Sequence, residues 1–219
     1  MDGMRRAALL VLLAAAAACG SNHAAAPSAK PATTTPAFDA ASALRPGTTV
    51  QRTIEADMDG DGTDEVAVWS EATTAPAGSV LRQSYVDVYG YTDGRWTHVF
   101  DASGSALAVD PRNVSQHVVF MRFVTFAHKP DLVLGVLNEG AGAGPLDVWI
   151  WSWGRPFKRE FRYSTTQGGT LATQGKTVTL DTGAFEPTDP MCCPSGMDHI
   201  VIGIKDGSIG IVGRTTTKS

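Results

Sequence analysis

Two Asp-Gly dipeptides, each placed between runs of β-forming residues, do most to restrict the folds open to this chain. Asp93-Gly94 lies within YVDVYGYTDGRWTHVF, and Asp206-Gly207 lies within IVIGIKDGSIGIVG. Asp-Gly tolerates the positive φ angles of a tight two-residue turn, and Val, Ile, Thr and aromatic residues favour strands. Both stretches therefore predict β-hairpins, and similar runs separated by Gly, Asp and Pro predict strands through most of the chain.

A degenerate internal repeat indicates how these strands are organised. VDVYGYTDGR, residues 86–95, aligns without gaps to LDVWIWSWGR, residues 146–155. Upstream of each copy an acidic residue opens an apolar run, EVAVW from Glu65 and DLVLGVL from Asp131. The alternative is chance similarity between β-rich segments. A closed propeller needs about four or more blades, so two or three units predict a mainly β, antiparallel fold: a twisted sheet, a sandwich or a partial propeller-like domain.

The N-terminus, MDGMRRAALLVLLAAAAACGS, has the layout of an export signal. Arg5 and Arg6 precede an apolar run over residues 7–18 that is shorter than the roughly 20 residues of a membrane-spanning helix. The alanines before Cys19 resemble the lipobox of bacterial lipoproteins, in which Leu is usual three positions before the cysteine. The resemblance implies cleavage after residue 18 and a diacylglycerol on Cys19, often with a further acyl chain such as palmitate; a plain secretory signal is the alternative. We expect lipid anchoring at the extracytoplasmic face of the cell membrane.

Composition divides the chain further. SNHAAAPSAKPATTTPA follows Cys19 and has no apolar period, which predicts a disordered tether over residues 19–37. We expect one β-rich domain over residues 38–215, opening with a short helix at 39–47 that Asp39 caps, and a tail at 216–219. Loss of residues 1–18 removes two arginines and one aspartate, so the net charge falls by one, from −4 to −5. That balance, without a basic cluster, argues against nucleic acid as a partner.

The stretch DMDGDGTDEVAVW, residues 57–69, crowds carboxylates into a loop before a strand. Calcium-binding loops supply carboxylates at alternate positions and a glycine at position six. With Asp57 as position one, Asp59 is at three, Asp61 at five and Gly62 at six. Position twelve, the bidentate Glu of an EF-hand, is Val68, so the loop leads into a strand and not a helix. The alternative is a polar turn whose carboxylates face water.

This loop resembles the acidic repeat of integrin-α, FG-GAP and VCBS proteins, D-x-[DN]-x-D-G-x-x-[DE] followed by alternating apolar residues. The resemblance covers residues 55–69. It implies one calcium site, which we expect to be structural because extracellular calcium modules bind weakly, at roughly 10⁻⁴–10⁻³ M. The implied ligands are the side chains of Asp57, Asp59, Asp61 and Glu65 and the main-chain carbonyl of Thr63.

Cys192 and Cys193, in DPMCCPSG, are the remaining cysteines. A disulfide between neighbours would be strained, because adjacent Cα atoms lie about 3.8 Å apart and disulfides usually span roughly 4.4–6.8 Å. In an oxidising compartment this vicinal bond is the obvious intramolecular pairing; free thiols or a bond to another chain are the alternatives. The segment from residue 189 onward resembles the C-terminus of the actinobacterial LppP/LprE lipoproteins, in which CCP[ST]G precedes a final hairpin.

Alternate residues of the repeated strands form an aromatic face with interspersed Asp. If the opposite, aliphatic face is the core, this face would suit stacking on a cell-wall glycan or contact with an envelope protein; the alternative is that both faces are buried between layers. The candidate ligand face comprises Tyr85, Tyr89, Tyr91, Trp149, Trp151 and Trp153.

No G-x-S-x-G, H-E-x-x-H or P-loop motif occurs, so the sequence offers no sign of an enzyme. We therefore expect a non-enzymatic binding or envelope-support module with one structural calcium ion. The alternative is an envelope enzyme or a redox-active protein that uses Cys192 and Cys193.

Overall fold

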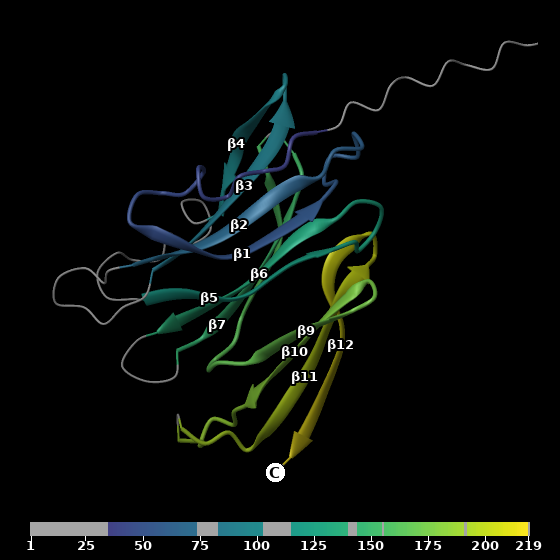
Figure 1. The fold of residues 1–219 in the computed structure, drawn as a ribbon. Coiled ribbons are helices and arrows are strands. Elements are labelled where there is room, and N and C mark those ends of the chain that lie inside the picture. The colour runs from purple at the N-terminus through teal and green to yellow at the C-terminus, as the bar shows by residue number, and fades with distance from the viewer. Residues whose placement is uncertain are drawn as a thin grey trace, which may run out of the picture. The chain divides into compact units, whose positions relative to one another are not determined.

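The computed structural model describes residues 35–73, 83–102, 115–139, 144–154, 156–190 and 192–218. The predicted lipidation site Cys19, the predicted signal sequence and the predicted tether up to residue 34 lie outside this part, and Thr35–Ser219 form one compact unit. The described residues are mainly β, as predicted, and are arranged as shown in Figure 1. Their strands are β1 (Thr48–Ala56), β2 (Glu65–Ala72), β3 (Ser84–Thr92), β4 (Arg95–Asp101), β5 (Ser115–Val124), β6 (Asp131–Glu139), β7 (Leu146–Ser152), β8 (Lys158–Ser164), β9 (Thr170–Gln174), β10 (Thr177–Ala184), β11 (Gly196–Lys205) and β12 (Ser208–Lys218).

The strands form three antiparallel sheets of four strands each, in chain order β1–β4, β5–β8 and β9–β12, here called sheets I, II and III. Both predicted hairpins are confirmed, because Asp93 and Asp206 adopt φ angles of 54° and 51° in the turns β3–β4 and β11–β12. The glycines that follow them also have positive φ angles, as a type I′ turn requires.

Sheet II is packed between the other two sheets (Figure 1). On β7, Trp149 and Trp151 join a hydrophobic cluster that contains Val86 and Val88 of sheet I. The alternate residues of β7, among them Ile150, join a second cluster with sheet III. The central strands of sheet II, β6 and β7, are therefore buried on both faces, which explains why they are almost continuously apolar.

Each sheet also buries one aspartate on its third strand, and these aspartates are between 3% and 6% exposed. Each aspartate interacts with a basic side chain of the fourth strand. In every sheet this basic residue pairs across the ladder with the residue two positions after the aspartate. Sheet III is thus a third copy of the unit that the sequence repeat predicts only twice. The pairs are Asp87 with His98, Asp147 with Arg162, and Asp198 with Arg214.

The outer faces of sheets I and III differ in what covers them. The outer face of sheet I is covered by the segment before β1, where Arg45 reaches Asp87 and the Tyr89 hydroxyl donates to the carbonyl of Ala43 at 2.8 Å. The outer face of sheet III carries exposed His199 and Met197, the latter 48% exposed. The outer face of sheet III is therefore exposed to solvent and carries both polar and hydrophobic side chains.

The described residues differ from three details of the expected organisation. The helix expected at 39–47 is not formed: residues 40–43 make a turn in which the Asp39 carboxylate accepts from the Ala41 amide, and Pro46 follows too soon for a stable helix. Residues 35–37, which were expected to belong to the tether, lie against sheet I, where the Trp96 indole donates to the Pro36 carbonyl at 3.1 Å. The expected tail is mostly strand, since β12 reaches Lys218. Within the described ranges no helix is long and apolar enough to cross a membrane.

Candidate functional site

The acidic loop joins β1 to β2 and begins directly after Ala56. Gly60 and Gly62 adopt φ angles of 79° and 89°, which residues with a Cβ rarely adopt. The loop folds on itself through its own carboxylates. Asp57 accepts from the amides of Gly60 at 2.6 Å and Gly62 at 3.1 Å, Asp59 from that of Asp61 at 2.9 Å, and Asp61 from that of Thr63 at 2.7 Å.

These bonds bring three predicted ligands together. One carboxylate oxygen from each of Asp57, Asp59 and Asp61 lies within 4.8 Å of the other two. Two ligands of one calcium ion lie at most about 5 Å apart, twice the roughly 2.5 Å ion–oxygen distance. Carboxylate oxygens are the donors that hard divalent cations prefer, and an oxygen bonded to one amide still has a free lone pair. The three residues therefore fit calcium in donor type and spacing.

Glu65, the fourth predicted carboxylate, lies apart from this group. It is 2% exposed, and its Oε2 accepts from the backbone amides of Met58 at 2.7 Å and Asp59 at 3.3 Å. Burial raises the pKa of Glu65 to about 7, with a smaller contribution from the negative charge of Asp59. Glu65 thus ties the loop to the start of β2, and ligation by Glu65 or by the Thr63 carbonyl stays a prediction.

Lys129 provides a positive charge at the edge of the loop. It comes from the β5–β6 connection, which occupies the corresponding place in sheet II, and its Nζ donates to the Asp59 carbonyl. An ammonium group relieves part of the repulsion among neighbouring carboxylates. No sequence pattern indicates this contact, because it joins residues 70 positions apart.

The cysteine pair lies on an exposed turn between β10 and β11. Both residues are free thiols, and their sulfur atoms are 2.7 Å apart. The hydrogen bond with Cys192 raises the pKa of Cys193. Asp189 orders the turn by accepting from the amides of Glu186 at 2.7 Å and Ser195 at 2.9 Å. The structure thus places the two sulfurs together without a bond between them.

The predicted aromatic ligand face is divided by the fold. Trp149 and Trp151 are 3% and 5% exposed, so they belong to the core and cannot bind a ligand at the surface. The tyrosines of β3 are half-buried, and Phe38 packs on Tyr89 with ring centroids 5.0 Å apart. Only Trp153 of the three tryptophans is partly open, because it follows the end of β7.

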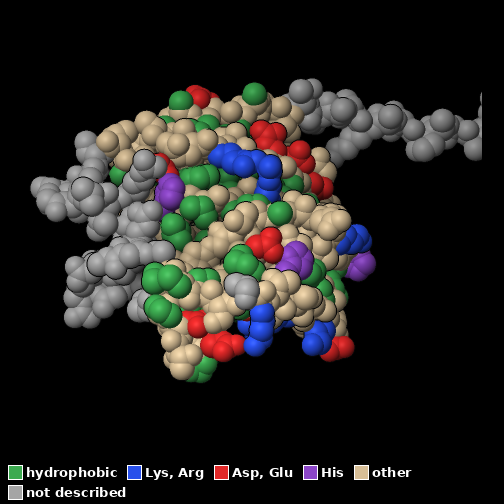
Figure 2. Space-filling view, turned by 90° about the horizontal axis from the view of Figure 1, so that it is seen from below, with side chains coloured by type: hydrophobic (Ala, Val, Ile, Leu, Met, Phe, Trp, Pro, Cys, Tyr) green, Lys and Arg blue, Asp and Glu red, His purple; other side chains and the backbone are tan. Residues whose placement is uncertain are grey.

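The face drawn in Figure 2 shows acidic and basic side chains among hydrophobic and uncharged ones. Such a mixture produces no extended field of one sign on that face. A scan against models of known protein families found no match, and neither did a search of curated proteins.

Proposed function

We propose that this chain is a lipid-anchored extracytoplasmic lipoprotein whose β domain is a non-enzymatic binding or envelope-support module with one structural calcium ion. The observation that carries the proposal is the loop between β1 and β2, where oxygens of Asp57, Asp59 and Asp61 lie within 4.8 Å of one another. Outside the cytoplasm, calcium at roughly 10⁻⁴–10⁻³ M is sufficient to occupy such a site.

The ion would act on the fold and not on a substrate. The loop connects two neighbouring strands of sheet I, and Glu65 of β2 holds the Met58 amide within it. Bound calcium would remove the repulsion of three carboxylates and so fix this connection. Sheet I would then be held in place for whatever partner the module binds.

The proposed location rests on the N-terminal sequence. The lipobox-like alanines before Cys19 and the C-terminal likeness to LppP/LprE lipoproteins both support an anchored envelope protein. Several buried acyl chains hold a protein at a membrane far better than one, because each buried methylene contributes about 0.8 kcal/mol. The mass of the mature chain tests this directly: cleavage before Cys19 with added acyl mass is expected, and a mature chain without acyl groups would contradict the anchor.

Thermal unfolding with calcium or with chelator tests the structural ion. We expect chelator to lower the melting temperature of the wild type and to have no effect on Asp59→Ala. Asp64→Ala is the matched control, since Asp64 is an exposed loop carboxylate outside the group of three. A melting temperature that is identical in calcium and chelator for the wild type would contradict the ion.

A second candidate function is thiol–disulfide chemistry, favoured by the exposed sulfurs of Cys192 and Cys193 at 2.7 Å. In exchange with an oxidised protein disulfide, the two thiols would lose two protons and two electrons and form the vicinal bond. Thiol labelling before and after reduction tests this, with Cys192→Ser as the control. A pair that labels fully without reductant would argue against the vicinal bond, and a bond that never reopens would argue against a redox role.

A further inference from the structure

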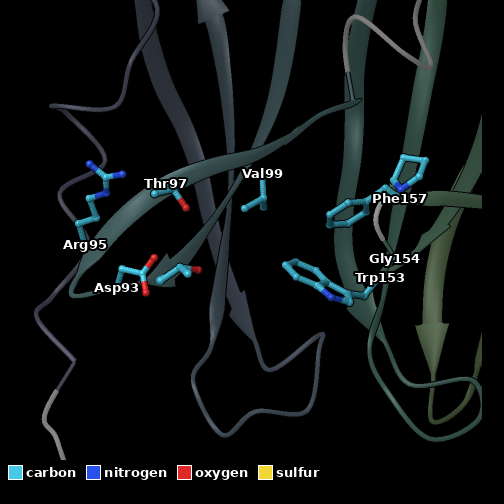
Figure 3. Close-up of a pocket in the computed structure, with 9 residues that line it drawn as sticks. Asp93, Arg95, Thr97, Val99, Trp153, Gly154 and Phe157 are labelled. Atoms are coloured by element: carbon cyan, nitrogen blue, oxygen red, sulfur yellow. The ribbon is translucent and has the colours of Figure 1, made fainter.

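A pocket of about 390 Å³ lies between the β3–β4 hairpin and the segment that follows β7 (Figure 3). Its volume falls within the roughly 300–1,000 Å³ of small-molecule sites. The pocket combines aromatic and aliphatic side chains from both sides with polar groups from the hairpin. The residues that matter are Asp93, Arg95, Thr97, Val99, Trp153 and Phe157.

One wall is a pair of fixed aromatic rings. Trp153 and Phe157 meet edge to face with centroids 5.0 Å apart, and Figure 3 shows both rings opposite Val99. Phe157 is in turn stacked on Phe100 at 4.3 Å and is only 9% exposed. Phe100 therefore fixes Phe157, and Phe157 in turn supports the half-open Trp153 ring. Binding of a ligand would then cost little side-chain conformational entropy at Trp153.

The hairpin supplies the polar groups. Asp93 stands at the positive-φ position of the turn, and Arg95 follows two residues later at the start of β4. Thr97 donates its hydroxyl to the Gly90 carbonyl at 3.2 Å, so its oxygen remains able to accept. Asp93 and Arg95 both line the pocket, with the Arg95 guanidinium directed away from the aromatic rings in Figure 3, and their opposite charges mean that the pocket favours neither an anion nor a cation.

We propose that this pocket binds a neutral saccharide. A sugar ring has an apolar C–H face that packs on an aromatic ring and hydroxyl groups that both donate and accept. Trp153 and Phe157 would receive the C–H face, while the Asp93 carboxylate and the Thr97 hydroxyl oxygen would accept from ring hydroxyls. This inference extends the proposed binding role and names its ligand class, and it is independent of the calcium loop.

Saturation-transfer NMR and titration of the full chain with maltose, cellobiose and N,N′-diacetylchitobiose test the proposal. At least one disaccharide is expected to bind, and Asp93→Asn and Trp153→Ala should each weaken that binding about tenfold. Asn also tolerates the positive φ of the turn, so Asp93→Asn keeps the hairpin even if Trp153→Ala fails to fold. Asp206→Asn is the matched control, because Asp206 occupies the same turn position in the β11–β12 hairpin.

Binding of none of the three sugars would overturn the proposal, as would binding that Asp93→Asn leaves unchanged. The same samples melted with and without chelator separate the two ideas. If chelator lowers the melting temperature and no sugar binds, the calcium proposal stands and the saccharide proposal fails. If a sugar binds and chelator has no effect, the saccharide proposal stands and the calcium proposal fails.

Discussion

Arg45, which lies before the first strand, donates two hydrogen bonds to the Asp87 carboxylate of β3, from Nε to Oδ2 at 3.0 Å and from Nη2 to Oδ1 at 2.8 Å. Such a fork-to-fork pair fixes orientation as well as charge. Arg45 also pairs with Asp101 at 2.7 Å and lies over the Tyr85 ring. Arg45 thus contacts three residues of sheet I, and it adds to the bonds that Ala43 and Pro36 accept from Tyr89 and Trp96 in attaching the segment that covers the outer face.

Arg45→Ala should lower the free energy of unfolding by about 2 kcal/mol, because it removes the guanidinium that bonds both oxygens of the buried Asp87 carboxylate. Urea unfolding measures the change. Arg122→Ala, at an exposed position of β5, should change stability by less than about 0.5 kcal/mol. Equal effects of the two substitutions would show that Arg45 does not hold the segment.

Asp198 should make stability depend on pH in the acid range. Hydrogen bonds from Arg214 lower the pKa of Asp198 in the folded chain, so the stabilisation is complete above the unfolded pKa of about 3.9 and is lost as pH falls through the lowered folded value. Wild type and Asp198→Asn should therefore differ most near neutral pH and converge in strong acid. A difference that is constant with pH would contradict this assignment.

Trp151→Ala should destabilise the fold by about 3–5 kcal/mol, because Trp151 is 5% exposed and packs on Phe100 with centroids 5.0 Å apart. Chemical denaturation gives the value. Trp96→Ala should cost less, since Trp96 is only half-buried. A stable Trp151→Ala protein would mean that the clusters between sheets I and II do not carry the fold.

Gly207→Ala should cost about 1–2 kcal/mol, because Gly207 has a φ angle of 78° in the β11–β12 turn. Gly168→Ala is the control, since a Cβ there would contact nothing within 4 Å and Gly168 has no positive φ angle. Thermal unfolding of both variants tests the turn geometry. A Gly207→Ala protein as stable as Gly168→Ala would rule out the type I′ turn.

Features set by a few neighbouring residues could be predicted from the sequence. The turn at Asp93 needs only the φ preference of Asp-Gly, and the approach of Asp57, Asp59 and Asp61 follows from their alternate spacing. Asp39 shows the limit of such reasoning, because its carboxylate accepts from the Ala41 amide as a cap would and yet residues 40–43 form only a turn.

Features set by the packing of sheets could not be predicted in the same way. Whether Trp149 faced water or a neighbouring sheet depended on sheet I lying against it, which periodicity alone does not reveal. The third copy of the repeat was not predicted from the sequence, because Asp198 and Arg214 are separated by a longer hairpin than the matching pairs of the first two copies. The pocket beside Trp153 joins two sheets, and its residues from Thr92 to Phe157 are far apart in sequence.

Calorimetric titration of the metal-free chain with calcium tests the central claim most directly. We predict one site per chain with a dissociation constant of roughly 10⁻⁴–10⁻³ M, lost in Asp59→Ala and retained in Asp64→Ala. At a calcium concentration about ten times that constant, binding would stabilise the fold by about 1.4 kcal/mol. Absence of binding to the wild type, or equal binding by wild type and Asp59→Ala, would contradict the account.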